Sequence, residues 1–161
     1  MSFFNQFSFV MMSVVVLIGA GALLWSAKRA PALLRIGAWL AALAGLIVFW
    51  SATRPLDTPE IKSPSDFEAR LGNGTPVVLE LYSEYCLGCM AQSSAVDALE
   101  SALGERAAVL RLSIHTEVGR ALWVRYQGET TPTFIIFDGA GREVRRTNAV
   151  PSAALVLGET P

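Results

Sequence analysis

Two long apolar runs precede a segment in which short apolar runs alternate with polar stretches. The first run covers 7–25 without a charged residue, and the second covers 36–52. At about 1.5 Å of rise per residue, a helix over each run approaches the ~30 Å thickness of a hydrocarbon core. We therefore expect residues 1–52 to form a transmembrane helical hairpin whose connecting loop is 26–35.

A secretory signal peptide is the alternative interpretation of the first run. Such a peptide carries positive charge ahead of a short apolar core. Residues 1–7 contain no Lys or Arg, the run is too long for such a core, and a second apolar run follows it. These three features favour a membrane span.

The apolar runs carry two further features of membrane helices. Trp25 and Trp50 lie near the ends of their runs, where aromatic side chains meet the membrane interface. Gly37, Ala41 and Gly45 recur every four residues and share one helix face, which permits close approach of another helix. Ordinary small residues in a lipid-facing helix are the alternative.

Basic residues set the expected orientation. Lys28, Arg29 and Arg35 fall within the connecting loop, and Arg54 is the single basic residue that argues for the opposite orientation. Loops rich in Lys and Arg stay in the cytoplasm. We therefore expect a two-pass protein of the bacterial inner membrane whose soluble domain faces the periplasm or the cell exterior.

A linker and one soluble domain follow the hairpin. Residues 53–64 contain Pro55, Pro59 and Pro64, which break helices and keep a tether extended. The soluble domain then covers 65–161.

The domain begins with a short helix and continues as alternating strands and helices. Ser65 and Glu68 have the spacing of a capping box, which predicts a helix that runs to Leu71. The apolar pattern predicts strands at 77–82, 107–114, 133–137 and 142–147, and helices at 86–103, 117–126 and 152–157. A β-α-β crossover followed by a β-hairpin predicts a compact α/β domain.

The charges are unevenly placed along the chain. All fourteen Asp and Glu residues lie at or beyond Asp57, so the net charge of −1 averages an apolar front and a mildly acidic domain. Neither part has the clustered basic face that nucleic acid binding requires. We expect a lipid bilayer and proteins as partners, and no nucleic acid.

Cys86 and Cys89 are the only cysteines in the chain, and they open the predicted helix 86–103. At a helix N-terminus, unpaired backbone N–H groups and the helix dipole favour a thiolate over a thiol. The thiolate attacks a substrate disulfide, and the second cysteine then attacks the mixed disulfide and releases the product. The pair therefore predicts a redox-active dithiol.

Other sites also use a C-x-x-C pair. Zinc takes about four ligands, and His115 is the only histidine in the chain. Haem attachment needs a histidine directly after the second cysteine, where this chain has Met90. We expect no metal and no cofactor beyond the Cys86–Cys89 disulfide itself. Two cysteines without a redox role are the remaining alternative.

The order of these elements resembles the thioredoxin family over residues 63 to about 157. Four features carry the resemblance: the strand that runs into Cys86, the opening of a helix by Cys86 and Cys89, the segment Thr131-Pro132-Thr133 at a strand start, and the hairpin at Phe137-Asp138-Gly139. The resemblance implies a thioredoxin-like α/β fold, a central mixed sheet flanked by helices, preceded here by the two-helix transmembrane hairpin.

Within the family, residues 81–90 and 134–143 look most like the outward-facing thioredoxin-like domain of DsbD-type thiol:disulfide interchange proteins. Those proteins carry reducing equivalents across the bacterial inner membrane. This chain lacks their large cysteine-bearing membrane domain. The resemblance therefore implies a separate membrane partner that donates electrons.

The matched positions imply roles for the dithiol and its substrate. Cys86 would be the solvent-facing, attacking thiol, and Cys89 the buried, resolving thiol. Pro132, in the cis form, would face the disulfide and leave the backbone of Thr131 free to pair with an extended protein substrate by strand addition.

Neighbouring positions depart from the family pattern. Tyr85 replaces the aromatic residue, usually Trp, before the first cysteine and would bind substrate, and Tyr82 replaces a second aromatic residue under the site. Plain packing is the alternative for both. Leu87-Gly88 replaces the Gly-Pro of thioredoxin, which leaves the redox potential open. Asn148 stands near the groove glycine of the family, and we expect His115 to be a surface residue.

Glu80 occupies the place of the buried acid of the family, which is normally an aspartate. Burial in a central strand raises the pKa of a carboxyl, so Glu80 could carry a proton to and from Cys89. Arg111 matches the position of the family lysine near that acid, and Arg holds its partner ionised more firmly. A structural Glu80–Arg111 ion pair is therefore the alternative to a catalytic Glu80.

The sequence thus favours a membrane-tethered protein-disulfide reductase that acts on extracytoplasmic disulfides. The alternatives are a disulfide oxidase or isomerase, and a non-catalytic thiol-binding module for cytochrome or copper-site assembly. Direction depends on a reduction potential that spans about −270 to −120 mV in such proteins.

Overall fold

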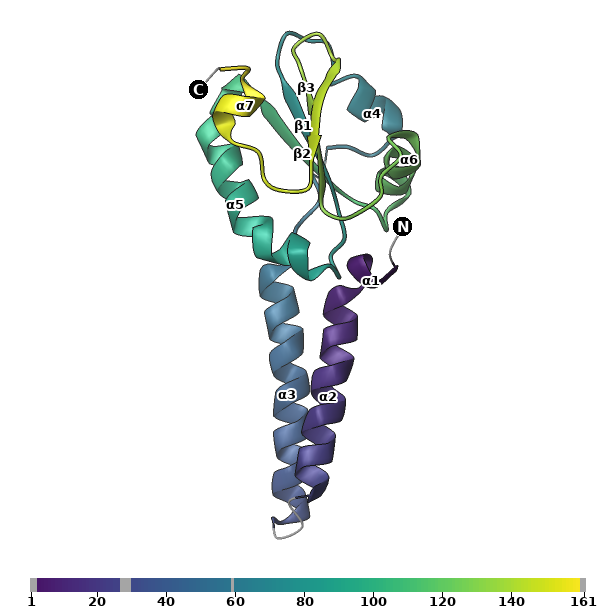
Figure 1. Cartoon of the computed structure of the whole chain (residues 1–161), viewed down its shortest axis with the longest axis vertical. Coiled ribbons are helices and arrows are strands. Elements are labelled where there is room, and N and C mark those ends of the chain that lie inside the picture. The colour runs from purple at the N-terminus through teal and green to yellow at the C-terminus, as the bar shows by residue number, and fades with distance from the viewer. Residues whose placement is uncertain (1–2, 27–29, 59, 160–161) are drawn as a thin grey trace.

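Two long antiparallel helices lead into an α/β domain (Figure 1). This computed structural model describes residues 3–26, 30–58 and 60–159. A short helix α1 (Phe3–Gln6) precedes the hairpin helices α2 (Ser8–Ser26) and α3 (Ala32–Thr53). Lys28, Arg29 and Pro59 lie outside the described residues, so the orientation that the first two predict stays a prediction.

The hairpin helices α2 and α3 are long and apolar enough to cross a membrane by length and composition, with mean hydropathies of 2.2 and 2.1. Helix α3 begins at Ala32, directly after Pro31 and four residues before its predicted start at Ile36. Proline is tolerated at the start of a helix, so Pro31 does not prevent this earlier start. Arg35 therefore lies in the helix. Gly37 and Gly45 are exposed, and a Cβ added at either would meet nothing within 4 Å, so α2 does not cover the small-residue face.

A four-stranded mixed sheet forms the centre of the soluble domain. Its strands lie in the order β2-β1-β3-β4, with β1 parallel to β2 and antiparallel to β3, and β3 antiparallel to β4. Their bounds are β1 Val77–Tyr82, β2 Ala108–Ser113, β3 Thr133–Phe137 and β4 Glu143–Thr147. Each lies within two residues of its predicted range. Every residue of β1 is buried, which explains its nearly continuous apolar sequence.

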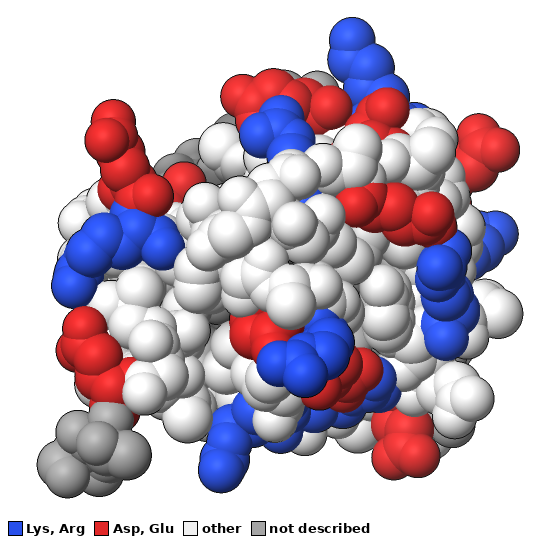
Figure 2. Space-filling view, turned by 90° about the horizontal axis from the view of Figure 1, so that it is seen from above, with Lys and Arg blue, Asp and Glu red and all other residues white. Residues whose placement is uncertain are grey.

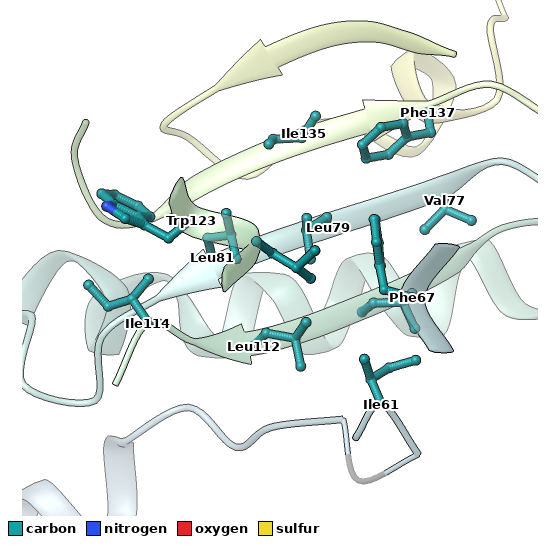
Figure 3. Close-up of a cluster of buried hydrophobic side chains, with 12 residues drawn as sticks. Ile61, Phe67, Val77, Leu79, Leu81, Leu112, Ile114, Trp123, Ile135 and Phe137 are labelled. Atoms are coloured by element: carbon teal, nitrogen blue, oxygen red, sulfur yellow. The ribbon is translucent and has the colours of Figure 1, made fainter. Parts of the chain in front are cut away.

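Helices cover both faces of this sheet (Figure 1). They are α4 (Pro64–Glu68) and α6 (Glu117–Arg125) on one face, and α5 (Leu87–Leu103) and α7 (Ala153–Val156) on the other, with a 3-10 turn η1 (Gly104–Arg106) after α5. Figure 3 shows the cluster of buried hydrophobic side chains on the α4 and α6 face, where Phe67 packs with Leu79, Leu81 and Leu112. Because strand residues alternate, Val78 and Glu80 point to the α5 face instead.

The first helix of the domain differs from its prediction. Its N-cap is Ser63, whose hydroxyl accepts a hydrogen bond from the Asp66 backbone N–H at 3.1 Å, and the predicted N-cap Ser65 lies inside the helix. Pro64 takes the first helical position, where its missing N–H costs nothing. The capping box assigned to Ser65 and Glu68 was therefore wrong, and α4 ends at Glu68.

The segment predicted as a tether is docked along the sheet. The Thr58 backbone N–H donates to the Arg111 carbonyl at 2.8 Å, and the Thr58 hydroxyl accepts from the Arg111 N–H at 2.9 Å. Asp57 accepts from the Ser113 N–H at 2.5 Å. Ile61 is buried in the core cluster. These contacts satisfy the open edge of β2.

Figure 2 shows the pole of the soluble domain that faces away from the hairpin. Acidic and basic side chains are interspersed around that face. No large area of it carries one sign of charge.

Candidate dithiol site

The dithiol lies where β1 passes into α5. Cys86 is the N-cap residue of α5, with extended backbone angles of φ −97° and ψ 118°, and Cys89 follows one turn later. Both are free thiols, and both are buried, so the expectation that Cys86 faces solvent was wrong. This pole of the domain adjoins the upper ends of α2 and α3 (Figure 1).

The two thiols have different acidities. A hydrogen bond from Cys89, with smaller contributions from the Thr131 side chain and the Cys89 and Gly88 N–H groups, lowers the pKa of Cys86 to about 6 despite its burial. Burial raises the pKa of the Cys89 thiol far above its ordinary value, and the adjacent Cys86 raises it further. At neutral pH, Cys86 is therefore the thiolate and Cys89 the thiol that donates to it.

Thr131 and Pro132 face the dithiol. The peptide bond between them is cis, the form implied by the resemblance. The Cys86 sulfur lies 3.4 Å from the Thr131 carbonyl oxygen. A Cβ placed on Gly88 would lie 3.7 Å from the Cys86 sulfur and 3.9 Å from Pro132 Cδ. A side chain at position 88 would therefore touch both Cys86 and Pro132 without a clash at its Cβ.

Asn148 anchors this proline segment. Its side-chain amide donates to the Pro132 carbonyl at 2.8 Å and to the Thr130 hydroxyl at 2.9 Å. Asn148 therefore holds this segment through its side chain.

The aromatic residue before Cys86 contacts the hairpin. The Tyr85 ring stacks on Phe7 with a centroid distance of 5.8 Å and on Trp50 with one of 6.1 Å. The Trp50 indole N–H also donates to the Glu84 carbonyl at 2.9 Å. Trp50 thus packs on the soluble domain as well as lying near the end of its apolar run.

His115 is half-buried rather than fully exposed. Its Nε2 lies 3.0 Å from the Ser83 hydroxyl, and its ring packs against Tyr85 and Phe7. The contacts that bury it come from the hairpin and from the loop before Cys86, which sequence periodicity does not reveal.

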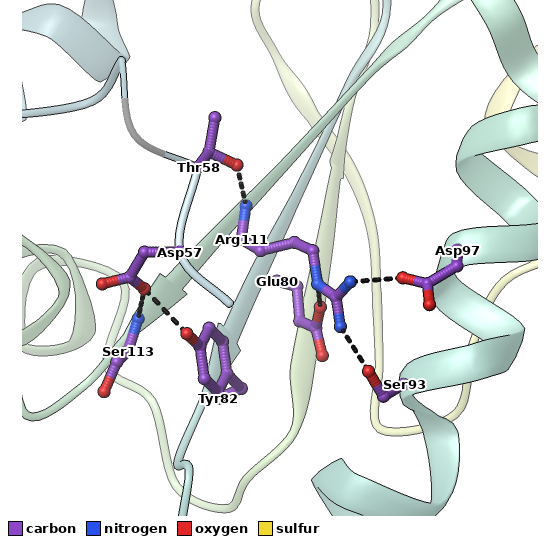
Figure 4. A network of polar contacts seen from close by, with 8 residues as sticks. All are labelled: Asp57, Thr58, Glu80, Tyr82, Ser93, Asp97, Arg111 and Ser113. Carbon is purple, nitrogen blue, oxygen red and sulfur yellow. Dashed lines mark hydrogen bonds and ion pairs between the residues drawn. The ribbon is translucent and has the colours of Figure 1, made fainter. Parts of the chain in front are cut away.

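Glu80 and Arg111 lie under α5, directly opposite each other on β1 and β2 (Figure 4). Arg111 Nε donates to Glu80 Oε2 at 2.8 Å, and the rest of the guanidinium binds Asp97 at 2.6 Å and Ser93 at 3.1 Å. Ser93 and Asp97 follow Cys89 at four-residue intervals, so all three share one helix face. The carboxylate hydrogen-bonds to Arg111 rather than to Cys89.

Burial raises the pKa of Glu80 to about 7, against the opposing effect of Arg111. The carboxyl is fully buried, and its Oε1 has no hydrogen-bonding partner among the described residues. Glu80 can therefore exist in both protonation states near neutral pH, although it is ion-paired.

Tyr82 forms a separate contact beneath the site. Its hydroxyl donates to Asp57 at 3.0 Å, and burial raises its pKa above the ordinary value (Figure 4). Tyr82 thereby ties the docked linker to β1. Among the described residues, no group of three or more His, Cys, Asp or Glu residues could hold a metal ion.

The fold and this site define a thioredoxin-like α/β domain with a C-x-x-C dithiol at a helix N-terminus. No protein-family model matches the chain. Over 76 residues, it is 25% identical to the thiol:disulfide interchange protein TxlA of Synechococcus elongatus, a match that covers 47% of this chain and 40% of that protein. The chain thus matches less than half the length of this curated relative.

Solved thioredoxin structures are also similar to the chain. The germline-specific thioredoxin Deadhead of Drosophila melanogaster is 22% identical with a TM-score of 0.49, over 56% of this chain and 85% of that one. Fasciola hepatica thioredoxin is 20% identical with a TM-score of 0.49, over 58% of this chain and 88% of that one.

Proposed function

We propose that this chain is a membrane-tethered thiol:disulfide oxidoreductase that reduces extracytoplasmic protein disulfides. The observation that carries the proposal is the division of acidity in the dithiol. Cys86 has a pKa of about 6, whereas the pKa of buried Cys89 is raised. Such a pair supplies a thiolate for attack and a protected thiol for resolution.

The dithiol gives two electrons to the substrate disulfide, and the two product thiols take one proton from Cys89 and one from water. The Cys86 thiolate attacks one sulfur of a substrate disulfide, and the departing thiolate takes up a proton. Cys89 then loses its proton and attacks the Cys86 sulfur, which releases the second substrate thiol and leaves a Cys86–Cys89 disulfide. A dithiol on a membrane partner returns the two electrons in a second exchange.

The acidity of Cys86 supports reduction over oxidation. Reducing members of this class have an attacking-thiol pKa of about 7, and strong oxidants one of about 3.5. The Cys86 pKa of about 6 lies nearer the reducing members. We expect a potential near the reducing end of the range, below about −200 mV, in equilibrium with glutathione. A potential near −120 mV would favour the oxidase alternative.

Single-cysteine variants test the proposed roles. In the full-length protein, Cys89→Ser leaves the Cys86 thiolate able to attack but removes the resolving thiol. We expect this variant to accumulate mixed disulfides with client proteins, detected as reductant-sensitive bands on gels. Cys86→Ser is the matched control and should accumulate few. Equal trapping by both variants, or by neither, would contradict the proposal.

A further inference from the structure

The N-terminal segment of the chain lies across the dithiol site. Asn5, at the start of the hairpin, hydrogen-bonds through its side-chain amide to Thr131. Its Oδ1 accepts from the Thr131 backbone N–H at 2.7 Å and from the Thr131 hydroxyl at 2.9 Å. Its Nδ2 donates to the Thr131 carbonyl at 3.1 Å. One side chain thus satisfies both backbone groups of Thr131.

These are the groups that an extended peptide would use. Strand addition pairs the N–H and C=O of one residue with a peptide group of the partner. A carboxamide offers the same donor and acceptor as a peptide group. Because Asn5 already occupies both groups, an extended substrate and Asn5 compete for Thr131.

Further contacts hold the segment in place. The Ser8 hydroxyl accepts from the Leu87 backbone N–H at 2.9 Å, at the first turn of α5. The Phe9 N–H donates to the Tyr85 carbonyl at 2.9 Å, and the Phe7 ring stacks on the Tyr85 ring. These contacts flank the dithiol.

The reactive thiol beside this segment is itself closed to solvent. Cys86 has the lowered pKa of an attacking thiol, yet it is only 1% exposed. A disulfide sulfur must approach within bonding distance of this atom, so the covering segment has to move before reaction.

We propose that residues 3–9 act as an intramolecular substitute for substrate, with Asn5 on the peptide-binding edge of Thr131, and that clients react only after this segment leaves. The inference rests on the peptide-binding role that the proposed function gives to Thr131. Since the segment and the site belong to one chain, the segment competes at a high effective concentration. The observed reactivity of Cys86 is then its intrinsic reactivity multiplied by the fraction of molecules from which the segment has left.

Alkylation of Cys86 tests whether residues 3–9 restrict access to this thiol, and it does not depend on redox activity. Full-length protein in detergent, as wild type and Asn5→Ala, is treated with iodoacetamide between pH 4 and 9, and the modification of Cys86 is followed by mass spectrometry. Loss of the Asn5 hydrogen bonds should raise the plateau rate at high pH by about 10- to 100-fold. The pH midpoint should stay near that of the wild type.

Asn73→Ala is the matched control, because the Asn73 side chain bonds only the Ala69 carbonyl on the surface. It should alkylate as the wild type does. Phe7→Ala removes the ring that stacks on Tyr85 and should accelerate alkylation independently of Asn5. An unchanged plateau in both Asn5→Ala and Phe7→Ala overturns the proposal, and so does a shifted midpoint without a higher plateau.

Reduction of a peptide disulfide, measured on the same samples, separates the two proposals. If alkylation accelerates in Asn5→Ala but no variant reduces the peptide, the closed segment is supported and the proposed function fails. If the wild type reduces the peptide while alkylation and turnover are unchanged in Asn5→Ala and Phe7→Ala, the proposed function stands and the substitute-substrate role is overturned.

Discussion

Glu80 is both ion-paired and able to bind a proton near neutral pH. It forms an ion pair with Arg111 at 2.8 Å, yet burial raises its pKa to about 7. Its Oε1 has no hydrogen-bonding partner among the described residues, so one oxygen holds Arg111 while the other can carry a proton. This arrangement fits both a structural pair and a proton carrier, and the two roles predict different measurements.

The stability of the oxidised protein should fall with rising pH because of Glu80. Its pKa is about 4.5 in the unfolded chain and about 7 in the folded chain. Between these values the folded state keeps a proton that the unfolded state has lost, so the free energy of unfolding decreases as pH rises. The contribution is complete below pH 4.5 and lost above pH 7, and it amounts to about 3 kcal/mol. Urea unfolding at several pH values measures it.

Glu80→Gln should remove this decline, since glutamine does not titrate. Oxidised protein is used because the Cys86 thiol contributes with the opposite sign when reduced. Its pKa falls from 9 to about 6 on folding, so its stabilisation grows as pH rises through that interval. A decline of equal size in Glu80→Gln would show that the pH dependence comes from other groups.

A kinetic prediction separates the catalytic role of Glu80 from the structural one. Glu80→Gln removes the buried carboxylate from Arg111 and leaves the guanidinium with Asp97 and Ser93, which costs stability up to about 3–5 kcal/mol. The double variant Glu80→Gln, Arg111→Met also removes the charge that has lost its buried partner. If Glu80 carries the proton of Cys89, this folded variant should resolve mixed disulfides about 10²-fold or more slowly, with the first attack unchanged. Stopped-flow kinetics measure the rate of attack by Cys86 and the rate of resolution by Cys89. If the double variant resolves mixed disulfides at the wild-type rate at every pH, Glu80 has a structural role.

At the scale of elements, local patterns in the sequence were sufficient for most of the soluble domain. The continuous apolar run of β1 and the C-cap Gly104 after α5 placed those elements correctly. The capping box was misassigned because Ser63 and Ser65 both lie near the start of a short helix, and only Pro64 at its first position distinguishes them.

Contacts between elements were not predictable in the same way. Asn5 and Thr131 are 126 positions apart, and their pairing depends on single polar side chains without any periodicity. The docking of the linker could not be predicted for the same reason, because Asp57 and Thr58 bind the β2 edge through side-chain oxygens. The dithiol was predictable because cysteine spacing and a helix start are local features. The contacts of Asn5 and Ser8 beside the dithiol were not, because they come from a segment far away in the sequence.

At the scale of the whole molecule, the dithiol lies at the pole of the soluble domain that meets the hairpin (Figure 1). Trp50, near the end of α3, donates a hydrogen bond to Glu84, two residues before Cys86. If α2 and α3 cross a bilayer, this pole lies at the membrane surface. In that position the dithiol could exchange with the membrane-embedded dithiol partner proposed above. The disulfides that it can reach then depend on the side of the membrane on which the domain lies.

The basic residues predict on which side of the membrane the soluble domain lies. Lys28, Arg29 and Arg35 outnumber Arg54 as basic residues near the ends of the two helices, so the connecting loop should be cytoplasmic and the soluble domain periplasmic. A reporter active only in the periplasm, fused after Pro161, should therefore be active in bacterial cells. A cytoplasm-specific reporter at the same position should be silent.

Replacing the basic residues of the loop tests whether they set the orientation of the hairpin. Lys28→Gln, Arg29→Gln and Arg35→Gln together remove the basic residues of the loop end and leave Arg54 as the basic residue nearest the hairpin. Because Lys and Arg, rather than net charge, set orientation, this variant should lose periplasmic reporter activity and gain cytoplasmic activity in part of the molecules. Arg54→Gln is the matched control, and it should keep the wild-type pattern. Cytoplasmic activity in the wild type would place the dithiol on the reducing side of the membrane, and reduction of periplasmic clients would then be excluded.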